Sequence, residues 1–405
     1  MNASNDQMSN KIIILGKTDY MSSIQIKNLS DALLYHARQH PSLIALRHKQ
    51  FGLWKEWSWS ELLQRTEEYL TALQQYQLQK EQTLLILSLP SIDVISLSLA
   101  IHALGGKVQL IENINEISEQ DMIEILNQLK PSYVLVDEIE QIKNLKLLEK
   151  FPTFVFHSDS YFHSYSYSQK IISLDELRQD AATLSSSSLA DIQLFENKIA
   201  FIVYQLDQKQ IVQVSLDHAS LINEANHLIH HHQLNQNEQA FISRAFSSVG
   251  HIRYLWSTWL IAGFTLNIPE NLETRDLDRK VIAPTLVLGT PQTYQRVEEI
   301  ILNRLTPSLK KHILSLQSND NVFINAYQKT VKFFLKHVVL EEIGFGRLKT
   351  ALIVGEKLSK QTQAFYQYFG IELHHWENIS ECPVENVQTL KAGWSSTQLS
   401  SSALH

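Results

Sequence analysis

Short apolar runs alternate with stretches of helical periodicity from residue 83 onward. The first block predicts strands at 84–87, 108–111, 133–136 and 154–156, with helices at 92–104, 118–129 and 141–149. A second block predicts strands at 199–204, 240–243, 265–268, 285–288 and 351–354, with helices at 217–232, 254–262, 291–304, 321–337 and 360–369. Alternation of this kind is typical of strands joined by crossover helices in a parallel sheet. We therefore expect an α/β fold with two stacked, mainly parallel-sheet subdomains and flanking helices.

The segment before residue 83 has a different pattern. Ser30 and Asp31 open a helix that ends near Pro41, and the run 43–59 places three tryptophans around a turn at Gly52, as in a β-hairpin. Changes in composition then suggest a division of the chain. We expect a flexible arm at 1–27, a first α/β subdomain at 28–195 with an exposed polar linker at 157–195, a second α/β subdomain at 196–394 and a tail at 395–405.

The most apolar stretch, 84–104, raises the question of a membrane span. Pro90, Asp93 and His102 interrupt it, which favours a buried strand followed by a buried helix over a transmembrane segment. The N-terminus lacks the basic-then-apolar order of a secretory signal. Residue Cys382 is the single cysteine, so the chain has no internal disulfide. These features predict a cytoplasmic protein without a transmembrane segment.

Charge and composition narrow the function classes. The chain has 405 residues, of which 44% are hydrophobic, and 35 Lys and Arg stand against 42 Asp and Glu for a net charge of -7. No basic run is long enough to follow a phosphate backbone, so nucleic acid is not an expected partner. A histidine cluster at 227–232 is either a solvated helix end or, through the i, i+4 pair His227 and His231, a metal ligand set. The former interpretation is favoured, and no metal is expected.

Three segments carry a family resemblance. They are ALRHKQFGLWKEWSWSELL at 45–63, LSLAIHALGGKVQLIE at 97–112 and ENLETRDLDRKVIAPTLVLGTPQTYQRV at 270–297. Over 28–394 the chain resembles the adenylate-forming (AMP-binding) superfamily, and in particular the N-terminal domain of bacterial long-chain acyl-CoA synthetases. The resemblance implies the fold of that domain. It also implies an ancestral reaction in which a carboxylate is joined to AMP, pyrophosphate leaves, and the acyl group passes to a thiol.

The phosphate-binding run of the family is degenerate here. The family has Tyr-Thr-Ser-Gly-Thr-Thr-Gly-x-Pro-Lys-Gly, whereas residues 204–214 of this chain read YQLDQKQIVQV. Every glycine that would let backbone N–H groups approach phosphate is gone. The degenerate positions include Tyr204, Asp207, Lys209 and Val212, and Asp207 adds a negative charge while Lys209 misses the position of the family's lysine. We therefore expect nucleotide binding in the family's manner to be weak or absent.

The resemblance also locates vestigial nucleotide and Mg²⁺ positions. The family's Gly-Gly-Ala-Pro corresponds to 354–357, where Gly355 survives. Its Gly-Tyr-Gly-Leu-Thr-Glu corresponds to 376–381, where Trp376 and Glu377 replace the first glycine and the adenine-stacking tyrosine, while Ser380 and Glu381 match the Thr-Glu end. The family continues with a mobile C-terminal lid domain, which is not present in these 405 residues. The sequence is thus expected to be degenerate and C-terminally truncated.

The acyl-tunnel region is better retained. By resemblance, the candidate lining residues of an acyl pocket are Tyr254, Trp256, Trp259, Gly289 and Pro291. Core packing alone is the favoured explanation for the aromatic residues. Together these observations predict a catalytically inactive acyl-CoA synthetase-like protein that binds an acyl chain, a carrier protein or an active homologue in lipid or secondary metabolism.

Two other function classes stay open at this point. A residual fatty-acid:CoA ligase or acyl-adenylating enzyme would need ATP and Mg²⁺, whereas no cofactor is expected otherwise. An interaction module without a ligand would show neither binding nor turnover.

Overall fold

The computed structural model describes residues 26–76, 82–112, 118–137, 154–158, 171–182, 187–191, 198–207, 210–242, 248–310, 335–355, 357–375 and 387–389. An eight-stranded sheet has the order β15-β9-β8-β4-β3-β5-β6-β7. Its strands are β3 (Thr83–Ile86), β4 (Lys107–Ile111), β5 (Tyr133–Val136), β6 (Phe154–His157), β7 (Ile171–Ser173), β8 (Ile199–Asp207), β9 (Gln210–Asp217) and β15 (Val387–Thr389). All neighbours in it are parallel except β8–β9 and β9–β15.

A seven-stranded sheet has the order β14-β13-β12-β10-β11-β1-β2. Its strands are β1 (Ile44–Gln50), β2 (Leu53–Ser58), β10 (Gln239–Phe241), β11 (Thr265–Ile268), β12 (Leu286–Gly289), β13 (Thr350–Ile353) and β14 (Leu373–His375). Only the hairpin β1–β2 is antiparallel. The predicted α/β class with two mainly parallel sheets is confirmed. In addition, β1 and β2 share a sheet with β10 to β14.

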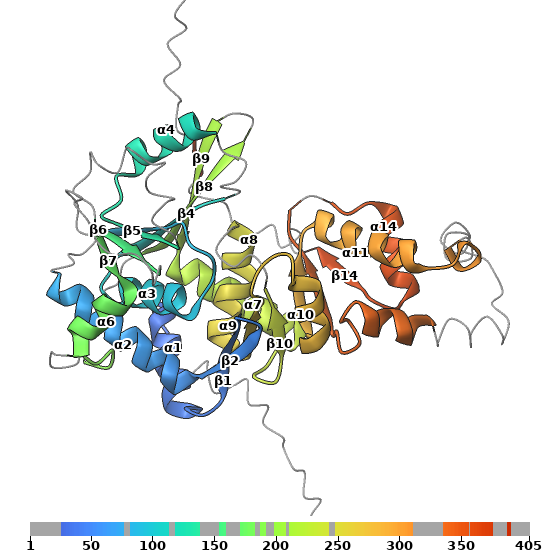
Figure 1. Ribbon diagram of the computed structural model, residues 1–405, viewed down its shortest axis with the longest axis horizontal. Helices are drawn as coiled ribbons and strands as arrows, with labels where there is room; N and C mark the ends of the chain where they lie inside the picture. The colour runs from blue at the N-terminus through green and yellow to red at the C-terminus, as the bar shows by residue number, and fades with distance from the viewer. Residues whose placement is uncertain are drawn as a thin grey trace, which may run out of the picture.

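Helices cover these sheets (Figure 1). They are α1 (Leu29–Gln39), α2 (Trp59–Gln75), α3 (Ile92–Ala103), α4 (Glu119–Leu129), α6 (Leu174–Ala182), α7 (His218–His232), α8 (Val249–His251), the π-helical turn η4 (Ile252–Trp256), α9 (Ser257–Ala262), α10 (Arg275–Ile282), α11 (Pro291–Arg304) and α14 (Lys360–Tyr368). All residues of α3 except Asp93 are buried, so its apolar sequence belongs to an internal helix. Among the described residues, no helix combines the length and apolar character needed to cross a bilayer.

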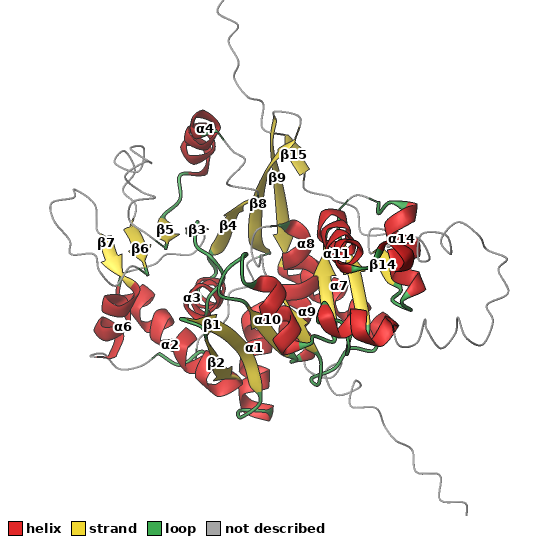
Figure 2. Cartoon of the chain, turned by 45° about the vertical axis from the view of Figure 1, so that its right-hand side comes forward, coloured by secondary structure: helices red, strands yellow, loops and turns green. Residues whose placement is uncertain are grey.

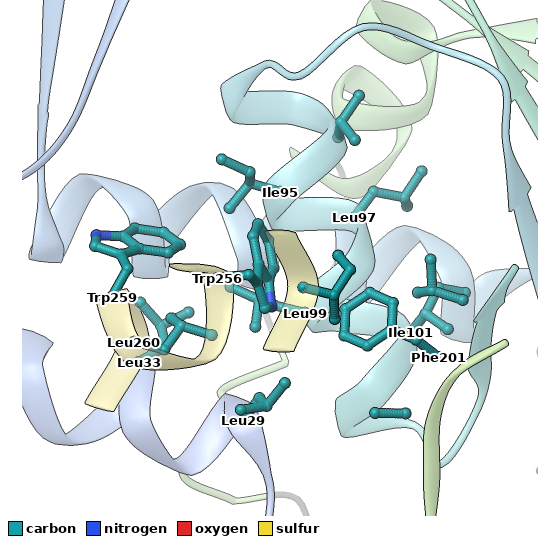
Figure 3. Close-up of a cluster of buried hydrophobic side chains, with 14 of the residues drawn as sticks. Leu29, Leu33, Ile95, Leu97, Leu99, Ile101, Phe201, Trp256, Trp259 and Leu260 are labelled. Atoms are coloured by element: carbon teal, nitrogen blue, oxygen red, sulfur yellow. The ribbon is translucent and has the colours of Figure 1, made fainter. Parts of the chain in front are cut away.

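The largest hydrophobic core joins both sheets through α1, α2, α3, α7 and α9. Figure 3 shows its centre, where side chains of α3 face those of α1 and of the segment that carries Trp256 and Trp259. The indoles of Trp59 and Trp259 stack with ring centroids 5.4 Å apart. Trp259 Nε1 also donates to the carbonyl oxygen of Ala45 in β1 at 2.9 Å. The core therefore fixes the helices to strands of the seven-stranded sheet.

Part of the predicted linker, 157–195, is regular structure. Strand β7 pairs in parallel with β6, and α6 follows it directly and packs on α2. The physical reason is a short apolar set hidden among polar residues: Ile172, Leu174 and Leu177 are all buried. The sequence pattern does not predict this strand, because the three residues of β7 are too few to show a strand periodicity.

Candidate functional site

Ligand sites of open α/β sheets lie beyond the carboxyl ends of the parallel strands. In this chain the carboxyl ends of β4 and β8, from one sheet, and of β13, from the other, lie near the start of α8. Glu112 follows β4, and its backbone N–H donates to the carbonyl oxygen of Tyr204 in β8 at 2.8 Å. From the other sheet, Val354 follows β13, and a Cβ atom built on Gly250 in α8 would lie 2.9 Å from its Cβ. The candidate site is therefore the junction of β4, β8, β13 and the start of α8.

The run 204–214 is a β-hairpin at this junction. Strands β8 and β9 pair antiparallel from Ile199↔Asp217 to Asp207↔Gln210, so only residues 208 and 209, outside the described part of the chain, separate them. On its other side, β9 pairs with β15 at residues 212–214 (Figure 2). Tyr204 likewise lies between β4 and β9. Residues 204–207 and 210–214 therefore belong to sheet ladders, in which alternate N–H groups donate to the neighbouring strand.

Two side chains of this hairpin, those of Tyr204 and Val212, pack into the fold. Tyr204 is 5% exposed and belongs to the cluster that packs under α4. Its hydroxyl donates to Oε1 of Gln213 at 3.3 Å. Burial raises the pKa of Tyr204 to about 12, and a hydrogen bond from Gln109 opposes that rise. Val212 packs against the main core. The backbone of Asp207 lies in β8, and Lys209 lies outside the described residues.

A carboxylate occupies the centre of the junction. The half-buried side chain of Glu112 accepts a hydrogen bond from the side-chain amide of Gln205. Burial raises the pKa of Glu112, and the interactions with Gln205 and with the backbone of Val249 oppose that rise. Sequence reasoning did not single out Glu112. Its position directly after a predicted strand, where ligand-facing residues of parallel sheets lie, is the signal that would have identified it.

The cation nearest in sequence to this helix start is already engaged. Arg253 in η4 forms a two-pronged ion pair with Glu224 of α7, with Nε 2.7 Å from one carboxylate oxygen. Glu224 is buried, and the guanidinium lies 5.7 Å from the ring centroid of Tyr254. The charge of Arg253 is thus compensated inside the protein.

The candidate acyl-pocket residues fall into separate places. Trp256 and Trp259 are 2% and 0% exposed in the main core, and Phe201 packs edge-on to Trp256 (Figure 3). Gly289, by contrast, faces Tyr294, which belongs to a second core cluster, and Pro291 is buried at the start of α11. Tyr254 is half-buried beside Arg253. The structure brings the two tryptophans together, and their role in binding an acyl chain stays a prediction.

Of the predicted nucleotide and Mg²⁺ positions, only Gly355 lies within the described residues. Gly355 has a φ of +89° and its carbonyl oxygen accepts a hydrogen bond from Nε2 of His375 at 2.9 Å. A Cβ atom on Gly355 would meet nothing within 4 Å. The remaining residues predicted for adenine and Mg²⁺, together with the single cysteine, lie outside the described residues: Trp376, Glu377, Ser380, Glu381 and Cys382.

The histidine cluster ends α7. The rings of His231 and His232 lie 4.7 Å apart, and His374 of β14 lies 4.9 Å from His232. Burial, followed by the neighbouring His374 and His231, lowers the pKa of His232 to about 4. Within the described ranges, no three His, Cys, Asp or Glu side chains are placed as ligands of one metal ion.

These residues do not fit a polyphosphate held in the family's manner. A phosphate cradle needs open N–H groups and positive charge. The described part of the hairpin is paired in sheet ladders, Glu112 places a carboxyl group at the junction, and Arg253 is paired with Glu224.

Comparisons with known proteins bear on the fold. No family model matches the sequence, and no curated protein matches it. Among solved structures, the A-PCP didomain of carboxylic acid reductase from Segniliparus rugosus in complex with AMP is similar at a TM-score of 0.67 and 14% identity, over 88% of this chain and 53% of that one. Apo MatB from Rhodopseudomonas palustris is similar at a TM-score of 0.61 and 15% identity, over 86% of this chain and 59% of that one.

A third structure, the fatty acyl-adenylate ligase from L. pneumophila in complex with acyl adenylate and pyrophosphate, is similar at a TM-score of 0.59 and 15% identity, over 87% of this chain and 54% of that one. The chain thus spans little more than half the length of these structures. At such low identity the likeness establishes the fold alone. On that basis the chain shares the fold of these adenylation-domain and ligase structures.

Proposed function

We propose that this protein is a catalytically inactive, acyl-CoA synthetase-like member of the AMP-binding family that binds an acyl chain, a carrier protein or an active homologue. It works without ATP or Mg²⁺, in the cytoplasm, in lipid or secondary metabolism. The observation that carries the proposal is the pairing of β8 with β9 as far as Asp207↔Gln210, across the run where the family holds phosphate.

Opening this hairpin for a nucleotide would be unfavourable. Each ladder hydrogen bond contributes about 0.5–1.5 kcal/mol net, so releasing several N–H groups between 204 and 214 costs several kcal/mol. Tyr204 would also leave its buried position in the cluster under α4. The incoming phosphates would then meet the carboxylate of Glu112. An acyl chain has no such requirement, because it needs apolar surface and no open N–H groups.

The first test is direct binding. The purified chain is titrated with C12 to C18 fatty acids and their thioesters by calorimetry, and separately with ATP and Mg²⁺ by thermal shift. We expect saturable acyl binding and no rise of the melting temperature with ATP, since a ligand that binds the folded state must stabilise it. Absence of binding to either acyl form, together with failure to copurify with any partner, contradicts the proposal.

A residual ligase is the competing function, favoured by Ser380 and Glu381, which match the Thr-Glu end of the family's magnesium-binding segment. A pyrophosphate-release assay with ATP, Mg²⁺ and palmitate separates the two. We expect no release above background from the wild-type chain. Release that depends on palmitate and disappears in Glu381→Ala would establish the ligase instead.

A further inference from the structure

An exposed phenylalanine lies at the tip of the hairpin β1–β2. The two strands pair as far as Gln50↔Leu53, which leaves a turn of two residues. These are Phe51 and Gly52, whose φ angles are +51° and +76°. Such a turn favours Asn, Asp or Gly at its first position, because a larger side chain is strained in the left-handed region. The side chain of Phe51 is 92% exposed, so the ring contributes almost no packing to the fold.

Helix α10 is also apolar on its outer side. Leu277 and Val281, one turn apart, are each 70% exposed. Asp278 and Arg279 are buried instead, and Nε of Arg279 donates to the carbonyl oxygen of Ile343 at 2.8 Å. A surface helix normally has the opposite arrangement, with its polar side chains outward. Most of the apolar surface of Leu277 and Val281 is therefore not used in packing within the chain.

Polar contacts fix the hairpin to α10. Nζ of Lys49 in β1 lies 2.5 Å from Oδ1 of Asp278, whose side chain is fully buried. The N–H of Gly52 donates to Oε2 of Glu270, in the segment that leads to α10, at 3.1 Å. Two neighbouring elements thus carry exposed apolar side chains, which we call the apolar set: Phe51, Leu53, Leu277 and Val281.

The shape of the hairpin tip favours a lipid bilayer as the occupant. A single ring that is exposed on nearly all sides needs a matching pocket on a protein partner. A bilayer needs no preformed pocket, because its acyl chains rearrange around an inserted side chain. The residues after the ring also follow the order found at a membrane interface, an aliphatic residue, then an aromatic one, then a cation: Leu53, Trp54 and Lys55.

The distribution of charge supports the same occupant. Over 49–55 and 270–282, five Lys and Arg stand against four Asp and Glu, whereas the whole chain has a net charge of -7. Lys55 is exposed beside the apolar tip. Anionic headgroups attract cations that lie close to the membrane surface. The hairpin and α10 therefore form a part of the chain that an anionic bilayer does not repel.

We propose that the hairpin tip and the outer side of α10 form a docking surface for an anionic lipid bilayer, into which Phe51 and Leu53 insert. This inference goes beyond the proposed function, because it concerns the surface on which the protein acts and is independent of what it binds. Transfer of a phenylalanine side chain from water into an apolar phase strengthens binding by about tenfold or more. The strained and exposed position of Phe51 is then explained by its use outside the fold.

The experiment measures sedimentation of the full-length chain with two kinds of vesicle, phosphatidylcholine alone and phosphatidylcholine mixed with phosphatidylserine. We expect wild type to bind the mixed vesicles. Phe51→Asn should bind them about tenfold more weakly or worse. Its urea midpoint should not fall, because Asn tolerates the left-handed region better than Phe does. Loss of binding in a variant as stable as wild type cannot result from misfolding.

Two more variants sharpen the result. Leu277→Gln combined with Val281→Gln should also weaken binding. Leu89→Asn is the control, because Leu89 is 60% exposed and lies elsewhere, where its N–H donates to Asp137; it should bind like wild type. The proposal is overturned if wild type does not bind the mixed vesicles, if either Phe51→Asn or the α10 variant binds like wild type, or if Leu89→Asn loses as much.

Light scattering without vesicles tests a different occupant. A dimer of wild type that becomes a monomer in Phe51→Asn, with vesicle binding absent or unchanged, would assign the apolar set to a second copy of this chain and overturn the proposal. Acyl binding is measured separately, so either outcome here leaves the proposed function standing.

Discussion

Gly263 offers a sharp test of how tightly the main core is packed. It ends α9 with a φ of +74°, and a Cβ atom built on it would lie 2.4 Å from Cε1 and 2.7 Å from Nδ1 of His36. The imidazole cannot easily move away. It stacks on Trp59 with centroids 4.6 Å apart, and its Nε2 bonds the carbonyl oxygen of Leu260 at 2.9 Å. Gly263→Ala therefore adds a methyl group where neither the backbone nor the neighbour has room.

The expected cost has two parts. A non-glycine residue in the left-handed region costs about 1–2 kcal/mol, and overpacking a rigid core costs about 1–3 kcal/mol more. Gly52→Ala is the matched control, because Gly52 has a φ of +76° but a Cβ atom there would meet nothing within 4 Å. It should show the backbone part alone. The free energy of unfolding should thus fall by about 2–5 kcal/mol for Gly263→Ala and by about 1–2 kcal/mol for Gly52→Ala.

Urea denaturation followed by circular dichroism measures both changes. A double-mutant cycle with His36→Ala then isolates the clash, because removing the ring leaves the added methyl group free of contact with it. In the His36→Ala background, the cost of Gly263→Ala should drop to that of Gly52→Ala. Equal costs for the two glycine variants, or no relief from His36→Ala, would refute the packing argument.

Two further predictions concern charge. Burial lowers the pKa of His36, His48 and His218 from 6.5 to about 4. Below pH 6.5 the unfolded chain therefore takes up protons at these histidines while the folded protein keeps them neutral. The free energy of unfolding should be highest above pH 6.5 and should fall toward pH 4, by up to about 3 kcal/mol for each histidine. Urea titrations at stepped pH check this, and a flat profile between pH 6.5 and 4.5 would contradict it. Lys49→Met leaves the fully buried carboxylate of Asp278 without its ion-pair partner at 2.5 Å and should destabilise by about 3–5 kcal/mol. The control is Arg304→Met, which removes an exposed ion pair with Glu342 and should leave the urea midpoint unchanged. Equal losses of stability in Lys49→Met and Arg304→Met would contradict the argument that burial decides the effect.

Elements with a long or strongly apolar pattern were predictable from the sequence. The expected strand 133–136 and helix 291–304 coincide with β5 and α11. The apolar stretch 84–104 is a buried strand and a buried helix, as its interruptions by Pro90 and Asp93 indicated. These elements follow from local periodicity, which a single sequence carries in full.

Features that depend on distant partners were not predictable in the same way. The run 204–214 was read as a degenerate loop, but the partners of Tyr204 lie in β4 and β9, and those of 212–214 include β15. The contact of Glu112 with Val249 also joins residues far apart in sequence. No local pattern reports such pairings, because register and neighbours are decided by the assembled sheet.

The parallel pairing of β1 with β11 bears on how the chain folds. Oγ1 of Thr265 donates to the carbonyl oxygen of Ile44 across 221 positions of the sequence. During synthesis the β1–β2 hairpin must wait for more than half of the chain before its inner edge is paired, and contacts of such long range make folding slow. A shorter fragment that ended before β11 would keep that edge bare, and a bare edge invites aggregation. Expression of the early segments alone should therefore yield insoluble material.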